Sequence, residues 1–245
     1  MKYDVFMVPG ELSSAELAGR TAVVIDVLRA ASTIVQALGS GASGIYPVAS
    51  VEEAIKLANS LGRDDVLLCG EKRCLPIEGF DLGNSPREFT PEVVAGKALV
   101  MNTTNGTHAL SLAGGAERVL VASFLNLQAV ARELAREGAD VVVVCAGREG
   151  RFTLEDAVCA GVLVDRVEGC ADSCEFNDAA LAARALAEKF EPGPGMFAGT
   201  AAGRMIVEAG LGDDLAVCAE IDRFDLVPVL EDRQIRLLEL TSSEV

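Results

Sequence analysis

Five short apolar runs, each followed directly by polar residues, dominate the pattern of this chain. The runs consist almost entirely of Val, Leu, Ala, Ile and an occasional Met or Cys: Ala22–Ile25, Val66–Cys69, Ala98–Met101, Val119–Ala122 and Val141–Cys145. Continuous apolar runs, as opposed to alternating ones, are typical of parallel strands whose two faces are both covered by helices. The pattern therefore predicts a largely parallel sheet that is buried on both sides.

A polar cluster stands at the end of each run. The clusters are Asp26 with Arg29, Gly70 with Glu71, the segment 102–107, Ser123 with Asn126, and Gly147 with Arg148 and Glu149. Ligands of open α/β sheets bind outside the carboxyl ends of the strands. We therefore expect these clusters to contribute to one shared site.

The remaining pattern alternates helices with strands. Helical periodicity is found at Arg29–Leu38, Val51–Leu61, Gly106–Leu112, Asn126–Glu137, Thr153–Val167, Cys174–Phe190 and Ala198–Ala209. Further strands are expected at Tyr3–Val8, Ile45–Val48, Leu215–Cys218, Leu226–Leu230 and Gln234–Leu238, the last two antiparallel. This order predicts the α/β class, as a three-layer α/β/α fold with a largely parallel, mixed sheet. We expect one α/β domain over residues 1–245, with two lobes, 1–120 and 121–245, as the alternative.

Composition narrows the functional classes. Half of the 245 residues are apolar, which suits a large core and argues against disorder. The net charge of −16 argues against a nucleic-acid partner, and an anionic substrate would need local positive charge from Arg, Lys, backbone N–H groups or a metal. The start of the chain lacks a secretory pattern, and no apolar run reaches the ~18 residues of a membrane span. These features predict a cytoplasmic protein without a membrane partner.

Cysteine and histidine usage excludes two kinds of site. The seven cysteines are scattered, and four of them lie in apolar runs or a helical pattern, where we expect small core residues: Cys69, Cys145, Cys159 and Cys218. The spacings of Cys69 to Cys74 and Cys170 to Cys174 do not match a zinc site, and His108 is the single histidine. A zinc centre and a histidine-based triad are therefore not expected.

The segment 102–107 is the richest polar cluster. Its hydroxyl, amide and backbone donors, at Thr103, Thr104, Asn105, Gly106 and Thr107, suit a phosphate at a helix N-terminus. The alternative is helix capping, for which one Thr or Asn would suffice. Because five of the six residues are polar, more than capping needs, we favour anion binding.

A long Gly- and Pro-containing loop covers residues 70–92, and we expect it to be ordered and functional. Within it, Asp81 suits either a metal or acid–base role or an Asx turn. Downstream, Arg148 and Arg151 suit planar recognition of phosphate or sulfonate oxygens. The acids Glu155 and Asp156 are explained by the dipole of the helix that they begin.

Asp26 follows a buried run, where a carboxylate is costly unless it is paired or binds a metal. An ion pair between Asp26 and Arg29 is one solution and a metal site is the other. Glu71 and Asp222 pose the same choice. Carboxylate oxygens of this kind suit Mg2+, which usually takes one or two carboxylates together with substrate phosphate and water.

Taken together, these segments resemble the 2-phosphosulfolactate phosphatase family, the ComB-like proteins. The resemblance spans nearly the whole chain and is carried by Val24–Ala30, Gly70-Glu71, Gly79–Pro86, Thr103–Thr107, Ala122–Asn126, Cys145–Gly147 and Leu154–Ala157, and more weakly by Asp214–Asp222 and Val227-Pro228. One departure is Lys72-Arg73-Cys74, where the family commonly has Arg-Gly-Gly. This change affects the backbone freedom of the loop and bears on the identity of the substrate.

The resemblance implies Mg2+-dependent hydrolysis of 2-phospho-3-sulfolactate to 3-sulfolactate and phosphate, a step that leads to coenzyme M in some organisms. Under this hypothesis Asp26, Glu71 and Asp81 are catalytic, and Mg2+ is held by a subset of Asp26, Glu71, Asp81 and Asp222. The substrate-binding residues are then Arg29, Asn84, Ser85, Thr103, Thr104, Asn105, Gly106, Thr107 and Arg148. The expected partner is a small anionic phosphorylated substrate, and a homodimer is compatible with the sequence.

Three rival hypotheses remain. A non-catalytic binding protein for a phosphorylated or sulfonated acid needs the same Arg and Thr donors but no carboxylate cluster. A nucleotide-dependent transferase is disfavoured because no Gly-x-Gly-x-x-Gly or Walker A pattern follows a strand. Cys145 as a nucleophile is disfavoured because the C-x5-R frame of cysteine phosphatases is missing.

Overall fold

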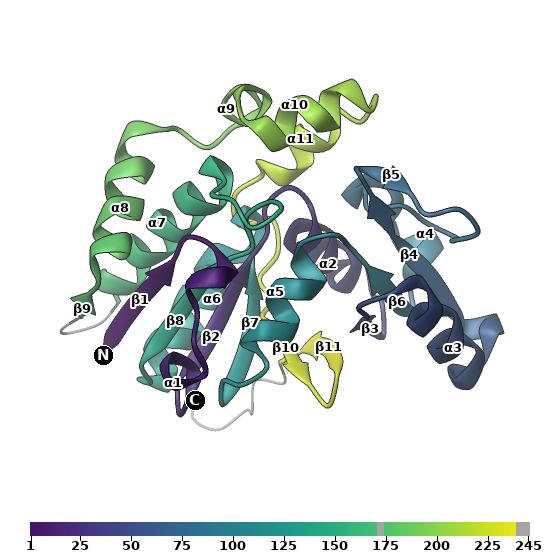
Figure 1. Ribbon diagram of the computed structural model, residues 1–245, viewed down its shortest axis with the longest axis horizontal. Helices are drawn as coiled ribbons and strands as arrows, with labels where there is room; N and C mark the ends of the chain where they lie inside the picture. The colour runs from purple at the N-terminus through teal and green to yellow at the C-terminus, as the bar shows by residue number, and fades with distance from the viewer. Residues whose placement is uncertain (171–173, 239–245) are drawn as a thin grey trace.

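A mixed sheet runs through the molecule, with helices packed on both of its faces (Figure 1). The computed structural model describes residues 1–170 and 174–238. Within them the strands are β1 (Lys2–Phe6), β2 (Thr21–Ile25), β3 (Gly44–Pro47), β4 (Val66–Lys72), β5 (Leu75–Pro76), β6 (Ala98–Asn102), β7 (Arg118–Ala122), β8 (Val141–Cys145), β9 (Glu175–Phe176), β10 (Pro228–Glu231) and β11 (Gln234–Leu237). The helices are α1 (Ser14–Leu17), α2 (Ala30–Gly39), α3 (Val51–Leu61), α4 (Pro91–Val94), α5 (Gly106–Ala113), α6 (Leu127–Glu137), α7 (Leu154–Glu168), α8 (Asp178–Lys189), α9 (Pro194–Gly199), α10 (Ala201–Glu208) and α11 (Asp214–Cys218).

The sheet consists of two parallel groups joined by a hairpin. Its order is β5-β4-β6-β3-β11-β10-β7-β2-β8-β1-β9, and the pairs β4–β6, β6–β3, β7–β2, β2–β8, β8–β1 and β1–β9 are parallel. The C-terminal hairpin β10–β11 pairs antiparallel with β7 on one side and with β3 on the other. The predicted antiparallel pairing of the last two strands is confirmed, and this hairpin makes the sheet mixed.

Alternation along β2 explains why its sequence is apolar throughout. Val23 and Ile25 pack into a core with residues of α6, α7 and α8, whereas Ala22 and Val24 pack into a second core with α2 and α5. Every residue of β2 is buried. The five apolar runs are the strands β2, β4, β6, β7 and β8, so the predicted α/β fold with helices on both faces is confirmed.

The strand order interleaves the two halves of the chain around residue 120. The early strand β2 lies between β7 and β8, and β1 lies beyond β8. The group β4-β6-β3 is instead built from residues 44–102, and it stands apart from the β7-β2-β8-β1 group in Figure 1. Among the described residues, no helix has both the length and the apolar character needed to cross a membrane.

The predicted strand Leu215–Cys218 is wrong, because this segment forms the helix α11. Leu215 and Cys218 are buried together with Asp214, while Ala216 faces solvent, and this spacing is helical. A short apolar run cannot be assigned to strand or helix by periodicity alone.

Two predicted helices are each divided in the structure. The segment predicted as one helix over Cys174–Phe190 begins with β9, and Asn177 then caps α8 by accepting a hydrogen bond from the N–H of Ala180. The predicted helix over Ala198–Ala209 is divided at Thr200, whose side chain caps α10. Asn and Thr bind backbone N–H groups through their side chains, which favours a new helix start at these positions.

The hairpin that joins the two parallel groups provides a test of the fold. Ile235 of β11 is fully buried and pairs with Ile45 of β3, whereas Leu237 on the same strand is 42% exposed. We expect Ile235→Ala to lower the free energy of unfolding by about 2–5 kcal/mol, because it leaves a cavity in the core. Leu237→Ala should lower the free energy of unfolding by less than about 1 kcal/mol. Equal losses of unfolding free energy for the two variants in denaturant titrations would contradict the burial of the hairpin between the two parallel groups.

Candidate active site

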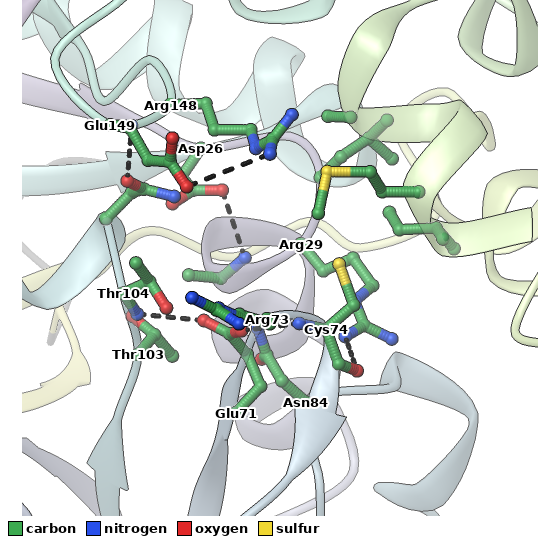
Figure 2. Close-up of a pocket in the computed structure, with 16 residues that line it drawn as sticks. Asp26, Arg29, Glu71, Arg73, Cys74, Asn84, Thr103, Thr104, Arg148 and Glu149 are labelled. Carbon is green, nitrogen blue, oxygen red and sulfur yellow. Dashed lines mark hydrogen bonds and ion pairs between the residues drawn. The ribbon is translucent and has the colours of Figure 1, made fainter. Parts of the chain in front are cut away.

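A cavity lies where the carboxyl ends of β2, β4, β6 and β8 come together (Figure 2). It is a small cavity of about 60 Å³ that is partly open to solvent. Its polar wall contains Asp26, Arg29, Glu71, Arg73, Asn84, Thr103, Thr104, Asn105, Arg148 and Glu149, and α10 closes one side with Ala202, Met205 and Ile206. Four of the five strand-end clusters thus meet in one place, whereas the sequence pattern predicted that all five would.

The fifth cluster has a structural role. The Asn126 side chain accepts a hydrogen bond from the N–H of Ser123 and donates to the carbonyls of Val121 and Leu226, at 3.1 and 3.2 Å. Ser123 and Asn126 are completely buried. They fix the end of β7 to the segment before β10 and do not line the cavity.

Asp26 is a buried carboxylate at the cavity. Its Oδ1 accepts a hydrogen bond from the N–H of Ala30 at 3.2 Å. Its pKa is raised to about 7, mainly by burial and also by the Glu71 and Glu155 carboxylates, against the lowering effects of the Ala30 N–H and of Arg29. A cation beside Asp26 would favour the charged form.

Glycine at position 106 leaves room around Asp26. A Cβ atom there would lie 2.9 Å from Asp26 Oδ2 and 3.4 Å from Thr103 Oγ1. The lack of a side chain at Gly106 therefore lets the N-terminus of α5 approach the carboxylate closely. Gly106 acts in this way and not through a contact with a ligand.

Glu71 bridges two walls of the cavity. Its Oε1 accepts a hydrogen bond from the N–H of Thr104 at 2.8 Å, and its Oε2 accepts one from the N–H of Cys74 at 2.9 Å. The side chain thus joins the β4–β5 turn to the segment between β6 and α5 (Figure 2). Glu71 thus lines the same cavity as Asp26, and its carboxylate is one of the charges that raise the pKa of Asp26.

Arg29 pairs with a residue that the sequence analysis did not single out. Its Nη1 lies 2.7 Å from Asp214 Oδ2, with both side chains almost completely buried, and its Nη2 donates to the carbonyl of Cys74 at 2.8 Å. The second oxygen of Asp214 accepts a hydrogen bond from Ser85 Oγ at 2.6 Å. The alternative of an Asp26–Arg29 ion pair is therefore not realised, and Ser85 acts on the cavity through Asp214.

The segment between β6 and α5 both caps the helix and lines the cavity, the two roles considered for it from the sequence. Thr103 Oγ1 accepts a hydrogen bond from the N–H of Thr107, and Thr107 Oγ1 donates to the carbonyl of Thr103, so both hydroxyls organise the start of α5. Thr103, Thr104 and Asn105 nevertheless line the cavity, whereas Thr107 lies behind it. Capping thus orders a segment whose polar atoms face the cavity.

The loop after β8 is held by hydrogen bonds. The backbone of Arg148 pairs with that of Arg151, and the N–H of Glu149 donates to Asn105 Oδ1 at 3.0 Å. Arg148 Nη2 lies 3.8 Å from Glu149 Oε1, so this pair is loose. Figure 2 shows both side chains on the cavity wall opposite Glu71, while Arg151 does not line the cavity.

Asp156 and Glu155 are more than acids of a first helical turn. Asp156 accepts hydrogen bonds from the N–H groups of Val27 and Gly147, at 2.8 and 3.1 Å, and so ties the ends of β2 and β8 together. Glu155 is buried, and its Oε2 has no hydrogen-bond partner among the described residues. Burial raises the pKa of both carboxyls.

Asn84 lines the cavity from the long loop after β4. It is buried, and its Oδ1 has no hydrogen-bond partner in the described part of the chain. Its backbone carbonyl accepts a hydrogen bond from Thr33 on α2, which fixes its position. The predicted loop over residues 70–92 thus delivers Asn84 to the cavity, in addition to Glu71 and Arg73 from its first part.

The structure places Asp81 and Asp222 outside the cavity, which corrects the expected set of four metal-binding carboxylates. Asp81 forms an ion pair with Arg63 at 2.7 Å and accepts a hydrogen bond from the N–H of Leu68. Asp222 pairs with Arg166 at 2.8 Å. Both carboxylates are therefore neutralised locally, and no cluster of three Asp, Glu, His or Cys side chains in residues 1–170 and 174–238 is arranged to hold a metal.

The cysteines match the core interpretation. Cys69, Cys145, Cys159 and Cys218 are buried, and all seven cysteines are free thiols. Burial raises the pKa of Cys145 well above its usual value, and the residue does not line the cavity. Cys145 is thus unsuited to be a nucleophile.

Comparison with known proteins places most of the chain in one family. A family model described as 2-phosphosulpholactate phosphatase matches residues 6–233. A relative from Symbiobacterium thermophilum, named a probable 2-phosphosulfolactate phosphatase, is 43% identical over 91% of this chain and 97% of its own length. Relatives of the same name from Caldanaerobacter subterraneus and Clostridium perfringens are 40% and 41% identical, over 92% and 98% of this chain and 93% and 97% of their own lengths.

An α/β fold with a polar cavity at the strand ends is typical of enzymes that act on small ligands. The family matches identify the class of enzyme. The chain belongs to the 2-phosphosulfolactate phosphatase family, which confirms the resemblance inferred from the sequence. The family consists of phosphoric monoester hydrolases.

Two adjacent aspartates test the buried ion pair. Asp214→Asn leaves the Arg29 guanidinium buried without a counter-charge, and we expect it to lower the free energy of unfolding by about 3–5 kcal/mol. Asp213→Asn removes an exposed pair with Arg87, which is worth about 0–1 kcal/mol. Equal effects of the two variants in chemical denaturation would contradict the role assigned to the Arg29–Asp214 pair.

Proposed function

We propose that this chain is a Mg2+-dependent phosphatase that hydrolyses the phosphate monoester of 2-phospho-3-sulfolactate, or of a related 2-phospho acid. The products are 3-sulfolactate and phosphate. Membership of the family and the names of its relatives support the substrate. One structural observation carries the proposal: the buried Asp26 carboxylate faces the same cavity as Glu71, three arginines and the start of α5.

The residues present fit a magnesium ion. Mg2+ is usually bound by one or two carboxylates together with substrate phosphates and water, and Asp26 and Glu71 are the two carboxylates that line the cavity from the ends of β2 and β4. Both carboxylates line the same cavity as the polar residues Thr103, Thr104 and Asn105, so a cation held there would lie next to possible phosphate-binding groups. When bound, the ion would neutralise charge on the phosphoryl oxygens.

The rest of the cavity is suited to hold the ester. Thr103, Thr104 and Asn105 present polar groups at the N-terminus of α5, where the helix dipole favours an anion. Arg148 adds a guanidinium from the opposite wall. These groups counter the net charge of −16, which would otherwise repel a phosphate ester.

A non-catalytic binding protein for a phosphorylated or sulfonated acid is the alternative. It would use the same arginines and threonines, but it would gain nothing from a buried carboxylate whose pKa is raised by burial. An anion would be repelled by Asp26 unless a metal or a proton neutralised it. The position of Asp26 therefore favours the enzyme.

Phosphate release from 2-phospho-3-sulfolactate tests the proposal. We expect turnover that requires Mg2+ and is abolished by a chelator. Asp26→Asn should reduce kcat/KM by roughly 10²- to 10³-fold, because it removes several kcal/mol of charge stabilisation from the transition state. A binding protein would show no turnover in either form, and metal-independent turnover would contradict the role of Mg2+.

The corrected positions of Asp81 and Asp222 give a second test in the same assay. Asp81→Asn and Asp222→Asn should each keep kcat/KM within about threefold of the parent protein, because neither residue lines the cavity. Thermal unfolding of each variant serves as the control for folding. Loss of turnover in a variant that remains folded would return that aspartate to the active site.

A further inference from the structure

Arg73 occupies an unusual position in the wall of the cavity. It lies in the turn between β4 and β5, where the pairs Glu71–Pro76 and Lys72–Leu75 leave Arg73 and Cys74 as the two loop residues. Both have left-handed backbone angles, with φ of 54° and 69°. Two-residue hairpin turns with positive φ at both positions favour residues such as Asn and Gly.

A side chain at such a position costs stability. A left-handed conformation is unfavourable by about 1–2 kcal/mol for residues other than glycine. Residues held in sparsely populated backbone regions persist only when their surroundings fix them, and they cluster at functional sites. Glycine would relieve this cost at position 73 but would supply no side chain.

The surroundings do fix this turn. The N–H of Cys74 donates to Glu71 Oε2 at 2.9 Å, and the carbonyl of Cys74 accepts a hydrogen bond from Arg29 Nη2 at 2.8 Å. The turn is thus held by two residues of the cavity itself. Figure 2 shows the side chain of Arg73 extending from this turn into the space between Glu71, Thr104 and Cys74.

The three arginines of the cavity differ in their partners. Arg29 is neutralised by Asp214 at 2.7 Å, and Arg148 lies 3.8 Å from Glu149. Arg73 forms no ion pair with any residue in the described ranges 1–170 and 174–238. A guanidinium is well suited to bind two oxygens of a planar or tetrahedral acid group at once.

We propose that Arg73 binds the acidic group of the substrate that is not the phosphate, a carboxylate or a sulfonate, and so selects phosphate esters that carry a second acid. This inference rests on the proposed function, because it assigns the phosphoryl group to the wall that carries Asp26 and Arg148, which Figure 2 shows opposite Glu71 and Arg73. Asp26 and Glu71 would hold a metal that neutralises phosphoryl oxygens, whereas a second acid would need a cation of its own. Among the described residues, Arg73 has no carboxylate partner, whereas Arg29 is paired with Asp214, and Arg148 is loosely paired with Glu149 and is assigned to the phosphoryl group.

Substitution of Arg73 separates substrate selection from folding. Arg73→Gly removes the guanidinium and relieves the left-handed strain, so the thermal unfolding midpoint should stay the same or rise. The kinetic measurement compares 2-phospho-3-sulfolactate, 2-phospholactate, which lacks the sulfonate, and phenyl phosphate, which lacks any second acid. Lys72→Ala is the matched control, because it removes a neighbouring exposed positive charge that does not line the cavity.

We expect Arg73→Gly to raise KM for 2-phospho-3-sulfolactate by about 10- to 100-fold, the loss typical of hydrogen bonds to a charged group. Phenyl phosphate should keep its KM within about twofold, and Arg73→Lys should recover part of the loss. If 2-phospholactate is affected as strongly as the sulfonated ester, the bound group is the carboxylate. If 2-phospholactate is unaffected, the bound group is the sulfonate. Equal losses for all three esters, or no loss for the sulfonated one, would overturn the inference.

Direct binding separates this inference from the proposed function. Titration calorimetry with 3-sulfolactate, which has both acid groups and no phosphate, should show weaker binding to Arg73→Gly than to the parent protein and to Lys72→Ala. This measurement decides the role of Arg73 even if no ester is hydrolysed. Equal affinity for the parent protein and Arg73→Gly would overturn the inference without affecting the proposed phosphatase activity.

Discussion

The buried ion pair between Arg29 and Asp214 holds the cavity together. The two residues are 185 positions apart in the chain, and their charged atoms lie 2.7 Å from each other. Arg29 also binds the carbonyl of Cys74 in the β4–β5 turn, and Asp214 binds the hydroxyl of Ser85 in the following loop. Removing two charges from water costs several kcal/mol per ion, so such a pair persists only when all of its hydrogen-bonding partners are in place. The end of β2, the β4–β5 turn and α11 therefore take their positions together.

This arrangement divides the charged residues of the cavity between structure and ligand binding. Arg29 is committed to Asp214, and Asp156 is committed to the N–H groups at the ends of β2 and β8. Asp26 and Glu71 remain for a cation, while Arg73 and Arg148 remain for the acidic groups of a ligand. The excess of acids over the whole chain is thus offset where an anionic substrate would bind.

The sequence was sufficient for the parts of the molecule that follow from local pattern. The buried runs that form β2 and β8 were recognised because both of their faces are covered, and the polar residues that follow them mark the cavity. The local pattern does not predict the role of Asp214, because its partner Arg29 is 185 positions away and the apolar run that follows it has the pattern of a strand. Asp81 and Asp222 have the residue type of metal ligands, but arginines that are remote in the sequence neutralise them. The departure at Lys72-Arg73-Cys74 did indicate altered backbone freedom, and the left-handed angles of Arg73 and Cys74 show where it lies.

A crystal structure of the protein with Mn2+ in place of Mg2+ and with tungstate in place of phosphate is the most direct test of the cavity as the catalytic site. Anomalous scattering would locate both ions. We expect the metal at about 2.1 Å from a carboxylate oxygen of Asp26, with tungstate beside it, near Thr103–Asn105. A metal bound at Asp81 or Asp222, or tungstate bound outside this cavity, would contradict the assignment of the strand-end cavity as the phosphatase site.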